Sequence, residues 1–122
     1  MTRPAVLVTG AAGYVGALLV NALATRRADL SALVALDWSE PGRFQTPTGV
    51  TNVQQDICDP SLTSLLRQHR IDTVVHLASI LRAPKNAPKD LAYRVDVLGT
   101  KNVLDACRSA GVRRLIVTSS GA

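Results

Sequence analysis

The sequence has few aromatic residues and no long apolar run. Aromatic side chains make up 3% of its 122 residues, so the core must be built from Val, Leu, Ile and Ala, the mix typical of a parallel sheet covered by helices. No apolar run reaches the roughly 18 residues that a membrane span needs, so we expect no membrane partner. The residues before the first apolar segment lack the apolar h-region of a signal peptide, and we therefore expect a cytoplasmic protein.

Cysteine is also scarce. Cys58 and Cys107 are the only two. They are too few for a disulfide framework and lack the spacing of metal ligands, so we expect reduced, partly buried thiols and no metal site. The formal net charge of +5 permits binding to phosphates or nucleic acid. Because the basic residues are scattered, without aromatic residues between them, we interpret them as a solvated helical surface and expect no nucleic-acid partner.

Apolar runs of strand length alternate with longer segments of helical periodicity. Strands are predicted at 5–9, 33–37, 50–54, 73–77 and 115–118. Their near-continuous apolarity is typical of strands buried on both faces of a sheet. Strands and helices that alternate in this way predict an α/β domain whose parallel strands are joined by right-handed crossovers.

Three helices are predicted between these strands. The first carries an apolar stripe from Val15 to Leu23, and the second follows Asp59 as N-cap with Pro60 in the first helical position. The third runs from about Lys89 to Ala110, and Gly111 follows it where a left-handed C-cap belongs.

The most informative segment is the turn between the first strand and the first helix. It reads Gly10-Ala11-Ala12-Gly13-Tyr14-Val15-Gly16. Small residues let the backbone approach a ligand closely, and the free N–H groups at the start of a helix form a site for a pyrophosphate. Gly16 would let the helix pack tightly. Such turns are frequent, so their context decides how much they indicate.

Asp37 supplies that context, because it closes the second strand 21 positions after Gly16. A carboxylate about 20 residues beyond the glycine turn binds the adenosine ribose hydroxyls in dinucleotide sites. It would repel a 2′-phosphate, which favours NAD over NADP. A turn residue at the end of a strand is the alternative interpretation of Asp37.

Further segments follow in a characteristic order. They are Asp56-Ile57, His76-Leu77-Ala78-Ser79, Val97-Leu98-Gly99-Thr100 with Asn102-Val103-Leu104, and Ile116-Val117-Thr118-Ser119-Ser120. Together with Thr9 to Gly16 they resemble the extended short-chain dehydrogenases/reductases, the NAD-dependent epimerase/dehydratase group. The resemblance implies a Rossmann-like parallel sheet with strand order 3-2-1-4-5 that binds NAD at the carboxyl ends of its strands.

The resemblance also implies roles for single residues. Asp56 and Ile57 would contact adenine, and the 77–79 segment would pass along the cofactor. The cofactor-binding residues that it implies are Gly10, Ala12, Gly13, Tyr14, Val15, Gly16, Asp37, Asp56, Ile57, Leu77, Ala78, Ser79 and Thr118. His76, without partners at ligand spacing, is expected to be a packed or hydrogen-bonded imidazole rather than a metal ligand.

The catalytic role implied for this chain belongs to Ser120, which would hydrogen-bond the reacting oxygen, with Thr118 and Ser119 beside it. The alternative is that these hydroxyls only terminate a strand. The family's acid–base pair, Tyr-x-x-x-Lys, has no counterpart, because Leu18 stands four residues after Tyr14 and Val97 four residues after Tyr93.

A second departure from the family is Asp96, which stands where the family usually has asparagine. An ionised carboxylate only accepts hydrogen bonds, whereas an amide also donates them. Any structural or proton-relay role of that asparagine is therefore in doubt for this chain.

We therefore expect residues 1–122 to form the NAD-binding part of a longer enzyme, with the sheet ending after its fifth strand. The catalytic helix and the substrate-binding part would lie outside these residues, and the chain would be inactive by itself. The parent would transfer hydride to or from a hydroxylated small molecule such as a nucleotide sugar, and could form a homodimer. A module that binds or senses NAD without catalysis is the alternative.

Overall fold

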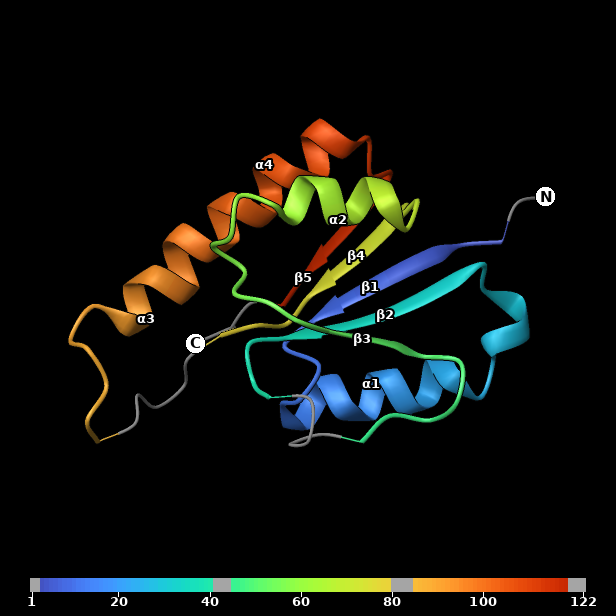
Figure 1. The fold of residues 1–122 in the computed structure, drawn as a ribbon, viewed down its shortest axis with the longest axis horizontal. Coiled ribbons are helices and arrows are strands. Elements are labelled where there is room, and N and C mark those ends of the chain that lie inside the picture. Colours follow the sequence, from blue (N-terminus) through green and yellow to red (C-terminus); the bar gives the residue numbers. More distant parts are fainter. Residues whose placement is uncertain (1–2, 41–44, 80–84, 119–122) are drawn as a thin grey trace.

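The computed structural model describes residues 3–40, 45–79 and 85–118, and they form a parallel sheet between two layers of helices (Figure 1). The strands are β1 (Ala5–Thr9), β2 (Ala32–Asp37), β3 (Thr51–Gln54), β4 (Thr73–His76) and β5 (Arg114–Val117). All pairs are parallel, in the order β3-β2-β1-β4-β5. The predicted fold class and strand order are confirmed, and the predicted strand bounds hold to within one residue.

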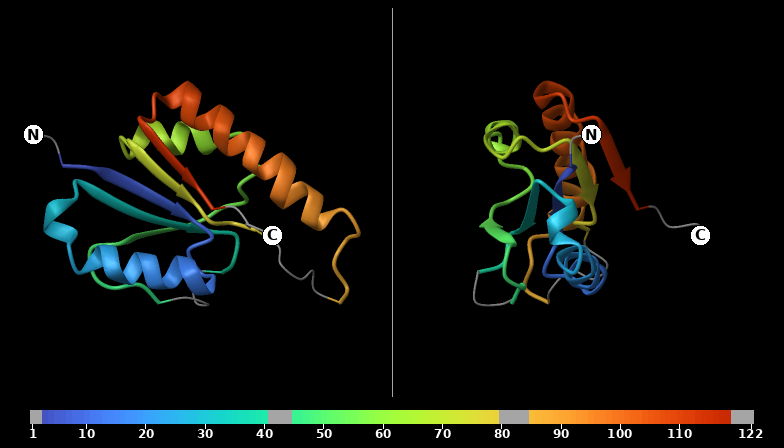
Figure 2. Two further views of the ribbon diagram at one scale, coloured as in Figure 1. Left: turned by 180° about the vertical axis from the view of Figure 1, so that it is seen from behind. Right: turned by 90° about the vertical axis from the view of Figure 1, so that its right-hand side faces the viewer.

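The helices lie on both faces of this sheet (Figure 2). They are α1 (Tyr14–Ala24), α2 (Leu62–Gln68), α3 (Leu91–Tyr93) and α4 (Thr100–Ala110), with a 3₁₀ turn at Arg27–Asp29 and a π-helical segment at Arg94–Gly99. Because α3, the π-helical segment and α4 are continuous, they form the long helix that the sequence predicts. Gly111 ends it in the left-handed conformation at φ 74°, also as predicted.

Alternating side chains of the central strands build two cores. Leu7, Leu36 and Val74 face α2 and α4, while Val8 and Ala35 face α1 and pack with Val20. This alternation follows from the pleat of a strand, which sends successive side chains to opposite faces. Both faces of β1 and β2 are therefore covered by side chains of the two cores.

Two sequence predictions need correction. Burial on both faces fails for β3 and β5, because these strands form the edges of the sheet and most of their residues are at least partly exposed. The second helix begins at Leu62 rather than at Pro60. Asp59 instead closes the turn before it, where its Oδ1 accepts the backbone N–H of Ser61 at 2.8 Å and its carbonyl that of Leu62 at 3.1 Å.

Candidate functional site

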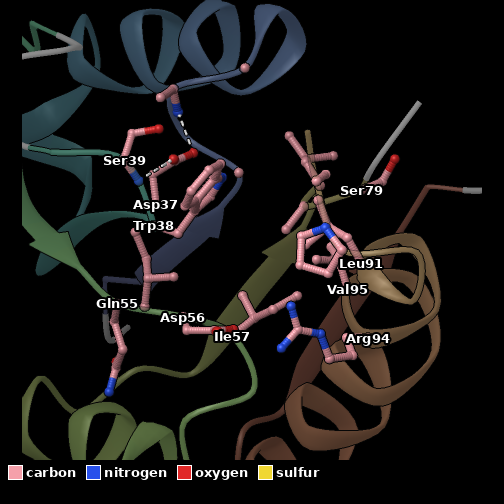
Figure 3. A pocket seen from close by; sticks show the side chains of 18 of the residues that line it. Asp37, Trp38, Ser39, Gln55, Asp56, Ile57, Ser79, Leu91, Arg94 and Val95 are labelled. Carbon is pink, nitrogen blue, oxygen red and sulfur yellow. Dashed lines mark hydrogen bonds between the residues drawn. The ribbon is translucent and has the colours of Figure 1, made fainter. Parts of the chain in front are cut away.

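A cavity of about 670 Å³ opens at the carboxyl ends of the strands, within the size range of ligand sites. Its walls come from the turn after β1, the end of β2, the segments 55–57 and 77–79, and the helical residues up to Val95 (Figure 3). It lies where the strand order changes direction, since the chain goes from β1 to β2 and β3 on one side and then crosses to β4 on the other side of β1. Open parallel sheets bind their ligands at such a switch point.

The glycine turn supplies one wall of this cavity. Gly10 has φ 68°, and a Cβ on it would lie 2.7 Å from the backbone nitrogen of Ala78. A Cβ on Gly16 would overlap the carbonyl oxygen of Gly10. These two glycines therefore bring α1 and the 77–79 segment against the end of β1. Gly13 differs, because a Cβ there would meet only the Gly10 oxygen, at 3.3 Å.

Helix α1 presents its amino-terminal end beside this turn. No side chain caps it, and its first turn contains no acidic residue. The first N–H groups of a helix have no partner within the helix, and they carry the positive end of its dipole. The turn thus offers backbone donors to an anion, and the residues that lead into the helix, Gly10 to Gly13, carry no side chain larger than a methyl group.

Asp37 fixes the shape of the turn. It is buried at the end of β2, and its Oδ2 accepts the N–H of Ala12 at 3.0 Å while its Oδ1 accepts the N–H of Ser39 at 2.9 Å. A carboxylate oxygen accepts more than one hydrogen bond, so Asp37 can still bind hydroxyl groups of a ligand. The carboxylate thus holds the protein's own backbone and faces the cavity at the same time.

A second polar network joins β1 to β4 beneath the cavity. The Thr9 hydroxyl accepts the N–H groups of Leu77 at 3.0 Å and Ala78 at 3.1 Å, which occupies its two lone pairs. Its own proton is therefore donated to His76 Nδ1, 2.7 Å away. The ring then carries its proton on Nε2, which donates to the Thr100 hydroxyl at 2.9 Å.

His76 is thus the hydrogen-bonded, packed imidazole that the sequence predicts. It is 2% exposed. Burial lowers its pKa below the ordinary value, and the negative charge of Asp96 acts in the opposite direction. The neutral ring locks the carboxyl ends of β1 and β4 to the start of α4, at the point where both strands deliver their turns to the cavity.

The start of α4 also positions Ile57 in the cavity wall. A Cβ on the buried Gly99 would overlap the Ile57 side chain, and Asn102 Nδ2 donates to the carbonyl oxygens of Ile57 at 2.6 Å and Asp59 at 2.9 Å. Asp56 closes its own turn, since its Oδ1 accepts the N–H of Cys58 at 2.8 Å. The segment 97–102 therefore serves to hold residues 56–59 rather than to contact the cavity itself.

The structure brings together most of the residues that the sequence predicts for the cofactor. Nine of them line the cavity: Gly10, Ala12, Gly13, Asp37, Asp56, Ile57, Leu77, Ala78 and Ser79. Tyr14, Val15 and Gly16 of α1 are not in its lining, and neither is Thr118, which is exposed one residue after β5. Ser119 and Ser120 lie outside the described residues, so the role of Ser120 stays a prediction.

Sequence reasoning missed several residues of the lining. Trp38 and Ser39 follow Asp37 directly, whereas Leu91, Arg94 and Val95 come from the far side of the cavity (Figure 3). Trp38 could have been found from its place next to Asp37. The helical residues carry no such signal, because only the tertiary fold brings them to the site.

The described part of the chain indicates neither a metal site nor a membrane-spanning helix. Among the described residues, no group of three or more His, Cys, Asp or Glu side chains could hold a metal ion. Within the same ranges, no helix has both the length and the apolarity for crossing a bilayer. Cys58 and Cys107 are unpaired, and Cys107 is buried, which raises its pKa to about 11.

Known proteins resemble this chain in sequence. The profile of the NAD dependent epimerase/dehydratase family matches residues 6–122. A UDP-glucose 4-epimerase of Mycolicibacterium smegmatis is 39% identical over 94% of this chain and 38% of its own length. A decarboxylating sterol-4-alpha-carboxylate 3-dehydrogenase of Bos taurus is 36% identical over 93% of this chain and 29% of its own.

Solved structures share the fold of this chain. A UDP-glucose-4-epimerase from Stenotrophomonas maltophila with bound NAD superimposes with a TM-score of 0.79 at 30% identity, over 97% of this chain and 37% of that one. A uronate dehydrogenase from Agrobacterium tumefaciens gives 0.76 at 26% identity, over 98% and 42%. The chain thus spans less than half the length of these relatives. On the match of nearly all its residues, it belongs to the NAD-dependent epimerase/dehydratase family.

Proposed function

We propose that this chain binds NAD in the cavity and is the cofactor-binding part of an enzyme that transfers hydride between NAD and a hydroxylated small molecule. The observation that carries the proposal is the pairing of an uncapped, glycine-lined helix amino terminus with a buried carboxylate at the end of β2. The first suits a pyrophosphate and the second suits ribose hydroxyls.

The residues of the cavity fit a dinucleotide. Gly13 leaves open the space that a side chain would fill, and the N–H groups at the start of α1 would hold the pyrophosphate. Asp37 would accept the adenosine ribose hydroxyls, and Asp56 and Ile57 would border the adenine. The volume of about 670 Å³ suits a ligand of this size.

Asp37 supports NAD rather than NADP. Its carboxylate is fixed by two backbone N–H groups at 3.0 and 2.9 Å, so it cannot swing away from a ligand without breaking both. A 2′-phosphate would bring a second negative charge against it in a partly buried site, where like charges repel strongly.

NAD, when bound, would supply the hydride acceptor. This chain's own residues would bind and orient it: Thr9 and His76 keep the 77–79 segment against the glycine turn, and the apolar side chains of Ile57, Leu91 and Val95 would exclude water. We assign Ser120 the positioning of the reacting oxygen, as the family resemblance implies. Because neither tyrosine is followed by lysine four positions later, we place no proton transfer on these residues.

The names of several relatives favour a nucleotide sugar as the substrate class, since two of those above are UDP-glucose 4-epimerases. The dehydrogenases among them favour other hydroxylated molecules. We propose a nucleotide sugar as the substrate of the whole protein. The absence of a Tyr-x-x-x-Lys pair from this sequence keeps a second candidate open, a module that binds NAD without turning it over.

The test is a calorimetric titration of the protein with NAD and with NADP. We expect one saturable site for NAD and affinity for NADP that is weaker by about tenfold or more. Gly13→Ala should weaken NAD binding by a similar factor, because its methyl group enters the cavity. Ser64→Ala, on the exposed surface of α2, is the matched control and should bind NAD like the wild type.

The substrate is tested separately, with the full-length protein, NAD and a panel of UDP-sugars, followed by NADH absorbance and by chromatography of the sugars. Conversion of one of them supports the enzyme proposal. Binding of NAD without any conversion favours the non-catalytic module. If NAD does not bind at all, the proposed function is wrong.

A further inference from the structure

Trp38 presents a large apolar ring that the protein itself does not cover. Its residue is 67% exposed, although it directly follows the buried Asp37. It is the only tryptophan of the sequence and, of the described residues that line the cavity, the only aromatic one. An exposed indole at the wall of a ligand cavity points to a role toward the ligand, because indoles gain most when both ring faces are covered.

The backbone on both sides of this indole is fixed. Asp37 binds the N–H groups of Ala12 and Ser39, and the Trp38 carbonyl accepts the Gln54 side-chain amide at 3.2 Å. The ring is therefore carried by a turn that is tied to the glycine turn and to β3. Its exposure results from its place in the fold rather than from a loose segment.

The opposite wall combines apolar side chains with that of Arg94 and lies across the cavity. Figure 3 shows the Trp38 indole on one side of the cavity and Leu91, Arg94 and Val95 on the other, with Ile57 near the floor. The cavity volume of about 670 Å³ leaves room for a planar ring between these walls.

We propose that Trp38 is a cofactor-binding residue and that its indole is the stacking platform for the purine base of the cofactor. The inference rests on the proposed function. With the pyrophosphate at the glycine turn and the ribose hydroxyls on Asp37, the base attached to that ribose lies beyond Asp37, where Trp38 is the adjacent ring.

The experiment compares the affinities of wild type, Trp38→Ala and Trp38→Phe for NAD, ADP-ribose and AMP. Stacking of a base on an aromatic side chain corresponds to between about fivefold and a hundredfold in affinity. We expect Trp38→Ala to weaken all three ligands by the same factor in that range, because all three carry the adenosine. Trp38→Phe should recover most of the loss, since it restores an aromatic face.

Fluorescence gives a readout that does not depend on a mutation. AMP, which lacks the nicotinamide, should quench the emission of Trp38 with the dissociation constant found by calorimetry. Tyr93→Ala is the matched control, because Tyr93 is an aromatic residue of comparable exposure, 57%, outside the cavity lining. It should bind all three ligands like the wild type.

The possible results separate the two proposals. If the wild type does not bind NAD, the proposed function fails and this inference fails with it. If the wild type binds NAD but Trp38→Ala binds it equally well, or if Trp38→Phe recovers nothing, only the stacking platform is overturned. Unequal losses for NAD and AMP, or AMP binding without quenching, overturn it as well.

Discussion

Gly13 and Gly16 belong to the same glycine motif, yet backbone atoms enclose Gly16, in the first turn of α1, and leave Gly13 open. A Cβ on Gly16 would overlap the Gly10 oxygen and lie 2.8 Å from the Gly10 carbonyl carbon, whereas a Cβ on Gly13 would meet one atom at 3.3 Å. Gly16 is required by the fold, because helix α1 could not otherwise lie against the end of β1. Gly13 leaves room for a ligand. A glycine motif thus combines two separate requirements.

The largest effect should come from Gly16→Ala. Its methyl group meets backbone that cannot move without displacing the end of β1, so we expect a loss of about 3 kcal/mol or more in the free energy of unfolding. Gly13→Ala should stay within about 1 kcal/mol of the wild type, because φ −74° and ψ 172° suit alanine. Urea denaturation of both variants measures the contrast, and equal losses would contradict it.

The next effect should come from Thr9→Val, which keeps the shape of the side chain and removes its hydroxyl. The N–H of Ala78 and Nδ1 of His76 then lose their partner in a buried place, which should cost about 2 kcal/mol. Thr100→Val removes one hydrogen bond of the same ring in a less buried position and should cost about 1 kcal/mol. If the two variants are equally stable, the network does not have the arrangement described here.

His76 should make the stability depend on pH. Because its pKa is lowered in the folded protein, the unfolded chain binds its proton first as the pH falls, and protons then favour unfolding. The stabilisation from the neutral ring is therefore complete above the ordinary histidine pKa of about 6.5. It is lost progressively as the pH falls below that value toward the pKa of the folded state.

Denaturant midpoints measured from pH 8 to pH 5 test this dependence. They should fall below about pH 6.5 in the wild type, and the part of the fall that comes from the ring should disappear in His76→Gln. An unchanged slope in that variant would show that other groups cause the pH dependence.

The smallest effect concerns Cys107, which lies in the core near Val103. With a pKa raised to about 11, it is almost wholly protonated at neutral pH, and the thiolate is the reactive form. In a Cys58→Ala background, labelling by a maleimide at pH 7.5 should be at least about a hundredfold slower in the folded protein than in urea. Equal rates would mean that the thiol is accessible.

Some features of the fold have a local signal in the sequence and could be predicted, whereas others depend on distant neighbours and could not. The strands could be located to within one residue because their apolar runs are interrupted by turn residues such as Gly10, and the long helix because Gly111 ends its pattern. The exposed edges β3 and β5 could not be recognised, since their burial depends on neighbours in the sheet.

The residues of the candidate site also divide into those with a local sequence signal and those without one. Asp37 and the glycine turn could be predicted because their spacing along the chain is itself the signal. Arg94 could not, because the opposite walls of a cavity come together through the tertiary fold and follow no local periodicity. The same is true of the bond between Thr9 and His76, which are 67 residues apart. Trp38, by contrast, could have been found from its place next to Asp37.

The central claim is that NAD occupies the cavity at the carboxyl ends of the strands, and hydrogen–deuterium exchange with and without saturating NAD tests it most directly. The account predicts slower exchange in peptides covering residues 10–16, 37–39 and 77–79. It predicts no change around Asp72, Arg113 and Arg114, which line a hollow of about 80 Å³ at the other end of the sheet. Protection around Asp72 and Arg113 with none at residues 10–16 would contradict the account.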